Sequence, residues 1–158
     1  MKALGGSGPI VVCLEPGQDS GPLVDCGIAL ARLLNVSLHL AVLLVLPEQR
    51  SLDLSHREEQ EAETVLDAAA GLARERDLAP TEEIWVARHW KEAVHGIAEE
   101  LSASAVVIAW RASGPLNLFD VGRTLLRAIP CPVIMVGQAP VQGDSPRWPP
   151  HWLAEAQL

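Results

Sequence analysis

The sequence predicts an α/β fold: a doubly wound, Rossmann-like parallel sheet of five strands with helices on both faces. Two observations support this prediction. Short apolar runs alternate along the chain with segments whose apolar residues recur every three or four positions. The runs are apolar at successive positions, as in strands buried on both faces, and the intervening segments have helical periodicity. Strands separated by helices favour parallel pairing through right-handed crossovers.

The first strand and helix are expected near the start of the chain. Residues 9–14 form an apolar run, and a helix is expected to begin at Ser20, because Pro22 suits a first helical turn. A second strand is expected over residues 36–46, which end at a proline. The apolar face of this first helix consists of Leu23, Cys26, Leu30, Leu33 and Leu34.

Two further helices flank a shorter strand in the middle of the chain. Ser55 and Glu58 have the spacing of a capping box at the start of a long amphipathic helix. Residues 84–87 form the third expected strand. The third helix is indicated by Val94, Ile97, Ala98 and Leu101.

The last part of the chain contains two more expected strands and a tail. Residues 105–109 and 132–137 are apolar runs, with a short helix expected over residues 122–129. We expect one domain over residues 1–138 and a C-terminal tail over residues 139–158, where prolines and turn residues are frequent. At 158 residues the chain has the size of a single domain.

Charge and hydropathy disfavour nucleic-acid and membrane partners. Twelve basic against twenty acidic side chains give a net charge of −8, whereas nucleic-acid binding requires a basic surface. The longest apolar stretch, residues 36–46, is about half the length that spans a bilayer. With no export signal apparent, we expect a cytoplasmic protein whose cysteines Cys13, Cys26 and Cys131 are reduced and serve as small apolar fillers.

Several short motifs occur in the order and spacing of a known family. The first helix ends in Ala-Arg-Leu-Leu at residues 31–34, and the third begins Lys-Glu-Ala-Val at residues 91–94. Residues 127–133, Arg-Ala-Ile-Pro-Cys-Pro-Val, lead into the last strand. Together these motifs resemble the universal stress protein family over residues 10–136. The resemblance implies an adenine nucleotide alpha hydrolase-like fold and an adenine-nucleotide site at the carboxyl ends of the strands.

The phosphate-binding motif of that family is altered in this chain. ATP-binding members carry Gly-x-x-Gly, nine residues and then Gly-Ser or Gly-Thr after the fourth strand. Here alanines replace the two leading glycines, and arginine replaces the Ser/Thr. Glycine allows close backbone approach to phosphate, which a Cβ atom blocks. The positions that match the family's site are Glu15 (for the family's Asp), Ala109, Arg111, Ala112, Gly122, Arg123 and, one place late, Thr124.

The resemblance leaves two functional readings open. In the first, the protein is a non-catalytic stress-response or signalling module with a degenerate nucleotide site, no firm cofactor and weak ATP binding at most. In the second, it binds ATP or AMP, with slow ATP hydrolysis, because Arg111, Arg123 and Arg127 replace the lost contacts. The altered loop favours the first reading.

No catalytic or metal-binding pattern stands out elsewhere. The histidines lack the spacing of a zinc site, and no Ser-His-acid triplet is apparent. Residues 16–20 faintly resemble the loop of adenylating pyrophosphatases, but an ordinary turn and helix cap explains them better. These patterns therefore indicate no enzymatic activity, and slow ATP hydrolysis stays open only in the second reading above.

The last strand is the expected partner surface. In the family it lies at an edge of the sheet, and a bare apolar edge invites pairing with a second chain. We expect a homodimer formed through this strand, and the sequence does not identify any other protein partner. The pairing residues are Val133, Ile134, Met135 and Val136.

Overall fold

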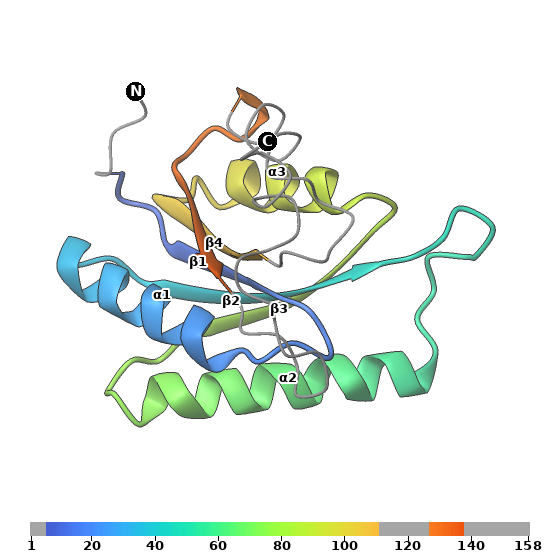
Figure 1. The fold of residues 1–158 in the computed structure, drawn as a ribbon, viewed down its shortest axis with the longest axis horizontal. Helices are drawn as coiled ribbons and strands as arrows, with labels where there is room; N and C mark the ends of the chain where they lie inside the picture. Colours follow the sequence, from blue (N-terminus) through green and yellow to red (C-terminus); the bar gives the residue numbers. More distant parts are fainter. Residues whose placement is uncertain (1–5, 111–126, 138–158) are drawn as a thin grey trace, which may run out of the picture.

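A computed structural model describes residues 6–110 and 127–137 of the chain. Five parallel strands form one sheet in the order β3-β2-β1-β4-β5. Helices α1 and α2 cover one face of the sheet and α3 lies on the other (Figure 1). The elements are β1 (Ile10–Leu14), α1 (Gly21–Leu34), β2 (Leu38–Val45), α2 (His56–Arg74), β3 (Thr81–Ala87), α3 (Trp90–Glu100), β4 (Ala105–Trp110) and β5 (Val133–Gly137).

The strand order confirms the predicted doubly wound sheet and fixes where a ligand site belongs. From β1 the chain proceeds outward to β2 and β3, then returns to β4 on the other side of β1. In such sheets ligands bind beyond the carboxyl ends of the strands where the order reverses. That point lies here between β1 and β4.

The strand boundaries differ from the predicted ones mainly in β3. This strand begins at Thr81, three residues before the predicted start at Ile84. Its first residues, Thr81, Glu82 and Glu83, are polar, as suits an edge strand that has only β2 beside it among the described strands. Strand β2 is shorter than predicted at both ends. Of the predicted helix over residues 122–129, residues 122–126 lie outside the described part, while 127 and 128 are helical.

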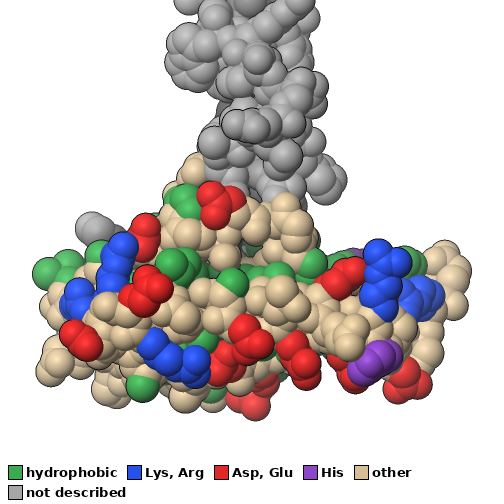
Figure 2. Space-filling model, turned by 90° about the horizontal axis from the view of Figure 1, so that it is seen from below, with side chains coloured by type: hydrophobic (Ala, Val, Ile, Leu, Met, Phe, Trp, Pro, Cys, Tyr) green, Lys and Arg blue, Asp and Glu red, His purple; other side chains and the backbone are tan. Residues whose placement is uncertain are grey.

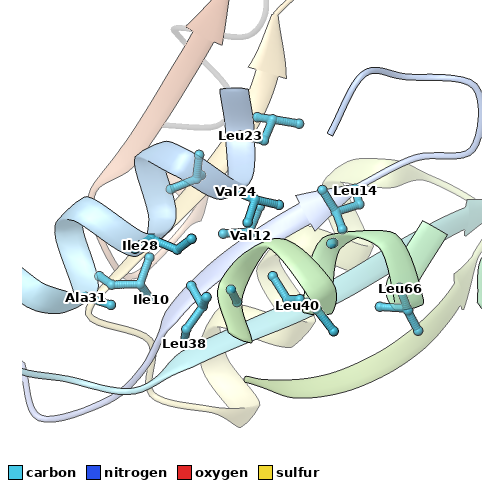
Figure 3. Close-up of a cluster of buried hydrophobic side chains, with 14 of the residues drawn as sticks. Ile10, Val12, Leu14, Leu23, Val24, Ile28, Ala31, Leu38, Leu40 and Leu66 are labelled. Carbon is cyan, nitrogen blue, oxygen red and sulfur yellow. The ribbon is translucent and has the colours of Figure 1, made fainter. Parts of the chain in front are cut away.

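The sheet separates two hydrophobic clusters. The cluster between the sheet and α1 and α2 is the larger, and its side chains come from alternate positions of each strand (Figure 3). The second cluster lies on the α3 face and contains the intervening strand residues. The labelled side chains of the first cluster are Ile10, Val12, Leu14, Leu23, Val24, Ile28, Ala31, Leu38, Leu40 and Leu66.

The start of α2 is held by the predicted capping box and by a salt bridge. The Ser55 backbone N–H donates to the Glu58 carboxylate (2.8 Å), and the Glu58 N–H donates to Ser55 Oγ (3.3 Å). Arg50 donates from both terminal nitrogens to the two oxygens of the same carboxylate, at 2.5 and 3.0 Å. Glu58 therefore connects the loop after β2 to the first turn of α2.

The contacts of Glu58 predict how the stability of the protein depends on pH. The Arg50 hydrogen bond, followed by those from Ser55, lowers the pKa of Glu58 from 4.5 to about 2. The stability that the ionised carboxylate contributes is therefore fully present above pH 4.5 and is lost as the pH falls towards 2. In Arg50→Met the pKa of Glu58 should rise, as measured by NMR titration of its side-chain carboxyl carbon. Arg57→Met is the control, because Arg57 pairs with Glu61 instead (3.0 Å). An unchanged Glu58 pKa in Arg50→Met would contradict the assignment.

The face of the molecule along α2 carries mixed charge. Acidic side chains are spread over this face, with basic side chains grouped towards its two ends (Figure 2). A nucleic-acid backbone binds a continuous positive surface, which this face does not present. Among the described residues, no helix combines the length and the apolar character needed to cross a membrane.

Candidate nucleotide site

A small cavity lies at the carboxyl ends of β1, β2 and β4, next to the point where the strand order reverses. Its volume is about 20 Å³, which is room for one water molecule. The sheet contributes its floor and α3 one wall. The residues that line it are Cys13, Glu15, Gln18, Leu43, Trp90, Val94, Ile108 and Ala109.

The turn after β1 supplies the polar side of the cavity. The Gln18 backbone N–H donates to the Glu15 carbonyl (3.3 Å), and Gly17 adopts a φ of +83°, a conformation that favours glycine. Gln18 Nε2 donates to Glu15 Oε2 at 2.9 Å. Because a carboxylate only accepts hydrogen bonds, this contact fixes the orientation of the amide and turns Gln18 Oε1 away from Glu15. Gln18 Oε1 is buried and has no hydrogen-bond partner.

The remaining walls are apolar and contain an unreactive cysteine. Burial, followed by the nearby Glu15 and Cys131, raises the pKa of Cys13 to about 12. Burial also raises the pKa of Cys26. A nucleophilic cysteine requires a lowered pKa, so Cys13 acts as an apolar lining residue, in agreement with the reading of the sequence.

Two of the predicted site residues lie together at this cavity. Glu15, at the end of β1, and Ala109, in β4, both line it. Arg127 is exposed on the helical turn before β5. The other predicted positions lie outside the described residues: Arg111, Ala112, Gly122, Arg123 and Thr124.

The sequence did not indicate Gln18 and Trp90 as site residues. Gln18 appeared to belong to an ordinary turn and helix cap, and that turn is present, with Asp19 Oδ1 accepting from the Gly21 N–H (3.1 Å). Trp90 packs against the hydrophobic cluster on the α3 face. The place of Trp90 at the cavity follows from the fold, because α3 is distant from β1 in the sequence, whereas Gln18 reaches the cavity from the turn directly after β1.

A second, wider depression lies on the other side of the turn after β1. It has a volume of about 570 Å³ and lies between Pro16 and Gly17 of that turn and the first turns of α2. Arg57 is the cation among its described lining residues and forms an ion pair with Glu61 at 3.0 Å. The depression is open and shallow, and its charges are balanced.

His39, a buried histidine of β2, has a structural role in the sheet. His39 Nδ1 lies 2.6 Å from Thr81 Oγ1, and Nε2 lies 3.2 Å from Glu83 Oε2. Both partners are on β3, so His39 attaches this edge strand to β2. Within residues 6–110 and 127–137, no group of three potential metal ligands occurs.

Comparison with known proteins decides the family. The family model described as "Universal stress protein family" matches residues 7–137, which include the whole sheet and the cavity. The chain belongs to the universal stress protein family. A search of curated proteins gave no match.

Solved universal stress proteins share the fold at low sequence identity. The Archaeoglobus fulgidus protein is 23% identical, with 80% of this chain and 96% of that chain covered and a TM-score of 0.65. Its complex with dAMP matches at 24% identity, 80% and 95% coverage and a TM-score of 0.62. An Arabidopsis thaliana family protein with AMP bound matches at 12% identity, 87% and 97% coverage and a TM-score of 0.56. These similarities support the observed fold.

Proposed function

We propose that this universal stress protein is a non-catalytic stress-response or signalling module. It forms homodimers, and its nucleotide site binds ATP weakly at most. The observation that carries the proposal is the size of the cavity at the carboxyl ends of β1 and β4. Ligand pockets have volumes of roughly 300–1,000 Å³, whereas this cavity measures about 20 Å³.

The residues around the cavity explain its small volume. Relatives with dAMP and AMP bound share the fold, and ligands of such sheets bind beyond the carboxyl ends of the strands. In this protein Trp90 and Val94 of α3 and Ile108 of β4 line the small cavity at that edge. A cavity of about 20 Å³ has no room for a base unless its walls move, and the energy required for that movement reduces affinity.

The altered loop sequence supports the same proposal. Ala109 lines the cavity at the position of the family's first loop glycine, and Ala112 and Arg123 stand at two further motif positions. A Cβ atom at such positions restricts the backbone and separates its N–H groups from phosphate. The phosphate groups of ATP therefore contribute little affinity.

This proposal predicts the outcome of a nucleotide titration. Titration calorimetry of the full chain with MgATP should show no binding in the low micromolar range (a Kd above roughly 10 µM). A sub-micromolar Kd would contradict the proposal and assign phosphate binding to Arg111 and Arg123. The triple change Ala109→Gly, Ala112→Gly, Arg123→Ser restores the family motif and should raise the affinity. Unchanged weak binding in that variant would place the obstruction at the closed cavity instead of the loop.

The two edges of the sheet support the proposed dimer. Strand β5 contacts β4 alone among the described strands, contains no charged residue and exposes 39% of Met135. The opposite edge strand, β3, carries Glu82 and Glu83. Charges on an edge strand discourage pairing with another chain, and their absence permits it. Strand β5 is therefore the edge suited to pairing across a twofold axis.

A further inference from the structure

We propose that Gln18 selects the ligand of this site by accepting a hydrogen bond from an amino group on a neutral base, and that it favours a 6-aminopurine over a 6-oxopurine. The inference rests on the proposed function, in which adenine-type ligands bind weakly at the carboxyl edge of the sheet. It adds a specificity-determining residue outside the positions that match the family's glycine motif.

The first step concerns the direction of the amide. Glu15 Oε2 accepts from Gln18 Nε2 at 2.9 Å, which leaves Gln18 Oε1 on the opposite side of the amide group. Rotating the amide by 180° would place two acceptor oxygens against each other, so the observed orientation is the stable one. The turn that presents this amide is shaped by Gly17 with its φ of +83°.

The second step concerns the missing hydrogen-bond partner of Gln18 Oε1. The oxygen is buried without a hydrogen-bond partner and belongs to a residue that lines the 20 Å³ cavity. A buried acceptor left unsatisfied destabilises a folded protein, and such groups in native structures commonly mark a ligand or water position. The other walls, among them Leu43, Val94 and Ile108, are apolar.

The third step identifies the ligand group. The cavity admits one group the size of a water molecule, and such a group must be a donor to satisfy Gln18 Oε1. An exocyclic amino group meets both conditions. The flat ring that carries it would lie at the mouth of the cavity, which Trp90 borders. A 6-oxo group would instead place an acceptor oxygen against Gln18 Oε1.

The experiment compares adenosine with inosine, two neutral nucleosides that differ at this position. Ligand-detected NMR titrations of the full chain, up to about 5 mM ligand to cover weak affinities, should show a preference for adenosine of roughly 10- to 100-fold. In Gln18→Met, which keeps the length of the side chain and removes the acceptor, the two nucleosides should bind equally. Gln49→Met is the matched control, because Gln49 is exposed in the loop after β2, and it should keep the wild-type preference.

A second measurement needs no ligand. Gln18→Met removes the unsatisfied buried acceptor together with the exposed hydrogen bond from Gln18 Nε2 to Glu15, whose loss costs less because water replaces it. The melting temperature of the free protein should therefore rise by about 2–6 °C. A lower melting temperature would mean that the Gln18 side chain stabilises the free protein as it stands, and it would overturn the inference. An adenosine preference that survives in Gln18→Met, or no binding of adenosine by the wild type, would also overturn it. Tight MgATP binding by the wild type would contradict the proposed function, but it would leave the comparison of adenosine with inosine and the melting temperatures as tests of Gln18.

Discussion

Replacing Gly27 with alanine is expected to destabilise the protein by about 1–3 kcal/mol, as overpacking of a core does. Gly27 lies in α1 where the helix packs against β1. A Cβ atom there would stand 2.3 Å from Val12 Cγ2 and 3.2 Å from Leu38 Cδ1. Val12 is β-branched and fully buried in the central strand, so its methyl group has no free rotamer to adopt. The helix would have to move away from the sheet.

A glycine-to-alanine substitution in α2 should instead increase the free energy of unfolding. A Cβ atom at Gly71 would meet nothing within 4 Å. Gly71→Ala should therefore stabilise the protein by about 0.5–1 kcal/mol, the helix-propensity difference between the two residues. Urea unfolding of both variants followed by circular dichroism measures the difference. Equal and small effects in the two variants would mean that α1 does not pack as closely on β1 as the structure has it.

The positions of the strands along the chain could be predicted from sequence because they are apolar runs. The start of β3 could not, because its first residues carry the polar side chains of an edge strand. The end of α1 at Leu34 agrees with the helix end expected over residues 31–34. A residue with positive φ lies one to three positions beyond each of α1, α2 and α3, and none of the three is glycine, the usual signal for a helix end. They are Asn35 (52°), Asp77 (60°) and Ser102 (47°).

The site could be predicted only in part, for a different reason. The resemblance indicated Glu15 and Ala109 as candidate site residues because motif positions are read one at a time along the chain, and both residues line the cavity. It could not indicate that Trp90 would line the same small cavity, because α3 brings this residue to the ends of strands that are distant in sequence. Nor could the resemblance indicate that Gln18 Oε1 is a buried acceptor without a hydrogen-bond partner. That observation depends on the amide orientation, which the hydrogen bond to Glu15 fixes.

The last prediction concerns the proposed dimer, and Met135→Lys is expected to convert it to a monomer. Met135 is the most exposed large apolar side chain of β5, with 39% of its surface accessible. In antiparallel pairing across a twofold axis, a lysine near the axis would face its own copy. Two like charges in close cross-strand positions repel one another, and desolvating each ammonium group adds a further cost.

The measurement is light scattering coupled to size exclusion at tens of micromolar protein, where the wild type should be a dimer and Met135→Lys a monomer. Leu33→Lys is the matched control: Leu33 is an apolar residue of α1 and not of β5, 79% of its surface is exposed, and its replacement should leave the dimer intact. Circular dichroism should give the same secondary structure for both variants, since each lysine replaces a side chain that already contacts solvent. If the wild type is a monomer at this concentration, β5 does not pair with a second copy. If Leu33→Lys dissociates the dimer while Met135→Lys does not, the interface lies on α1 instead.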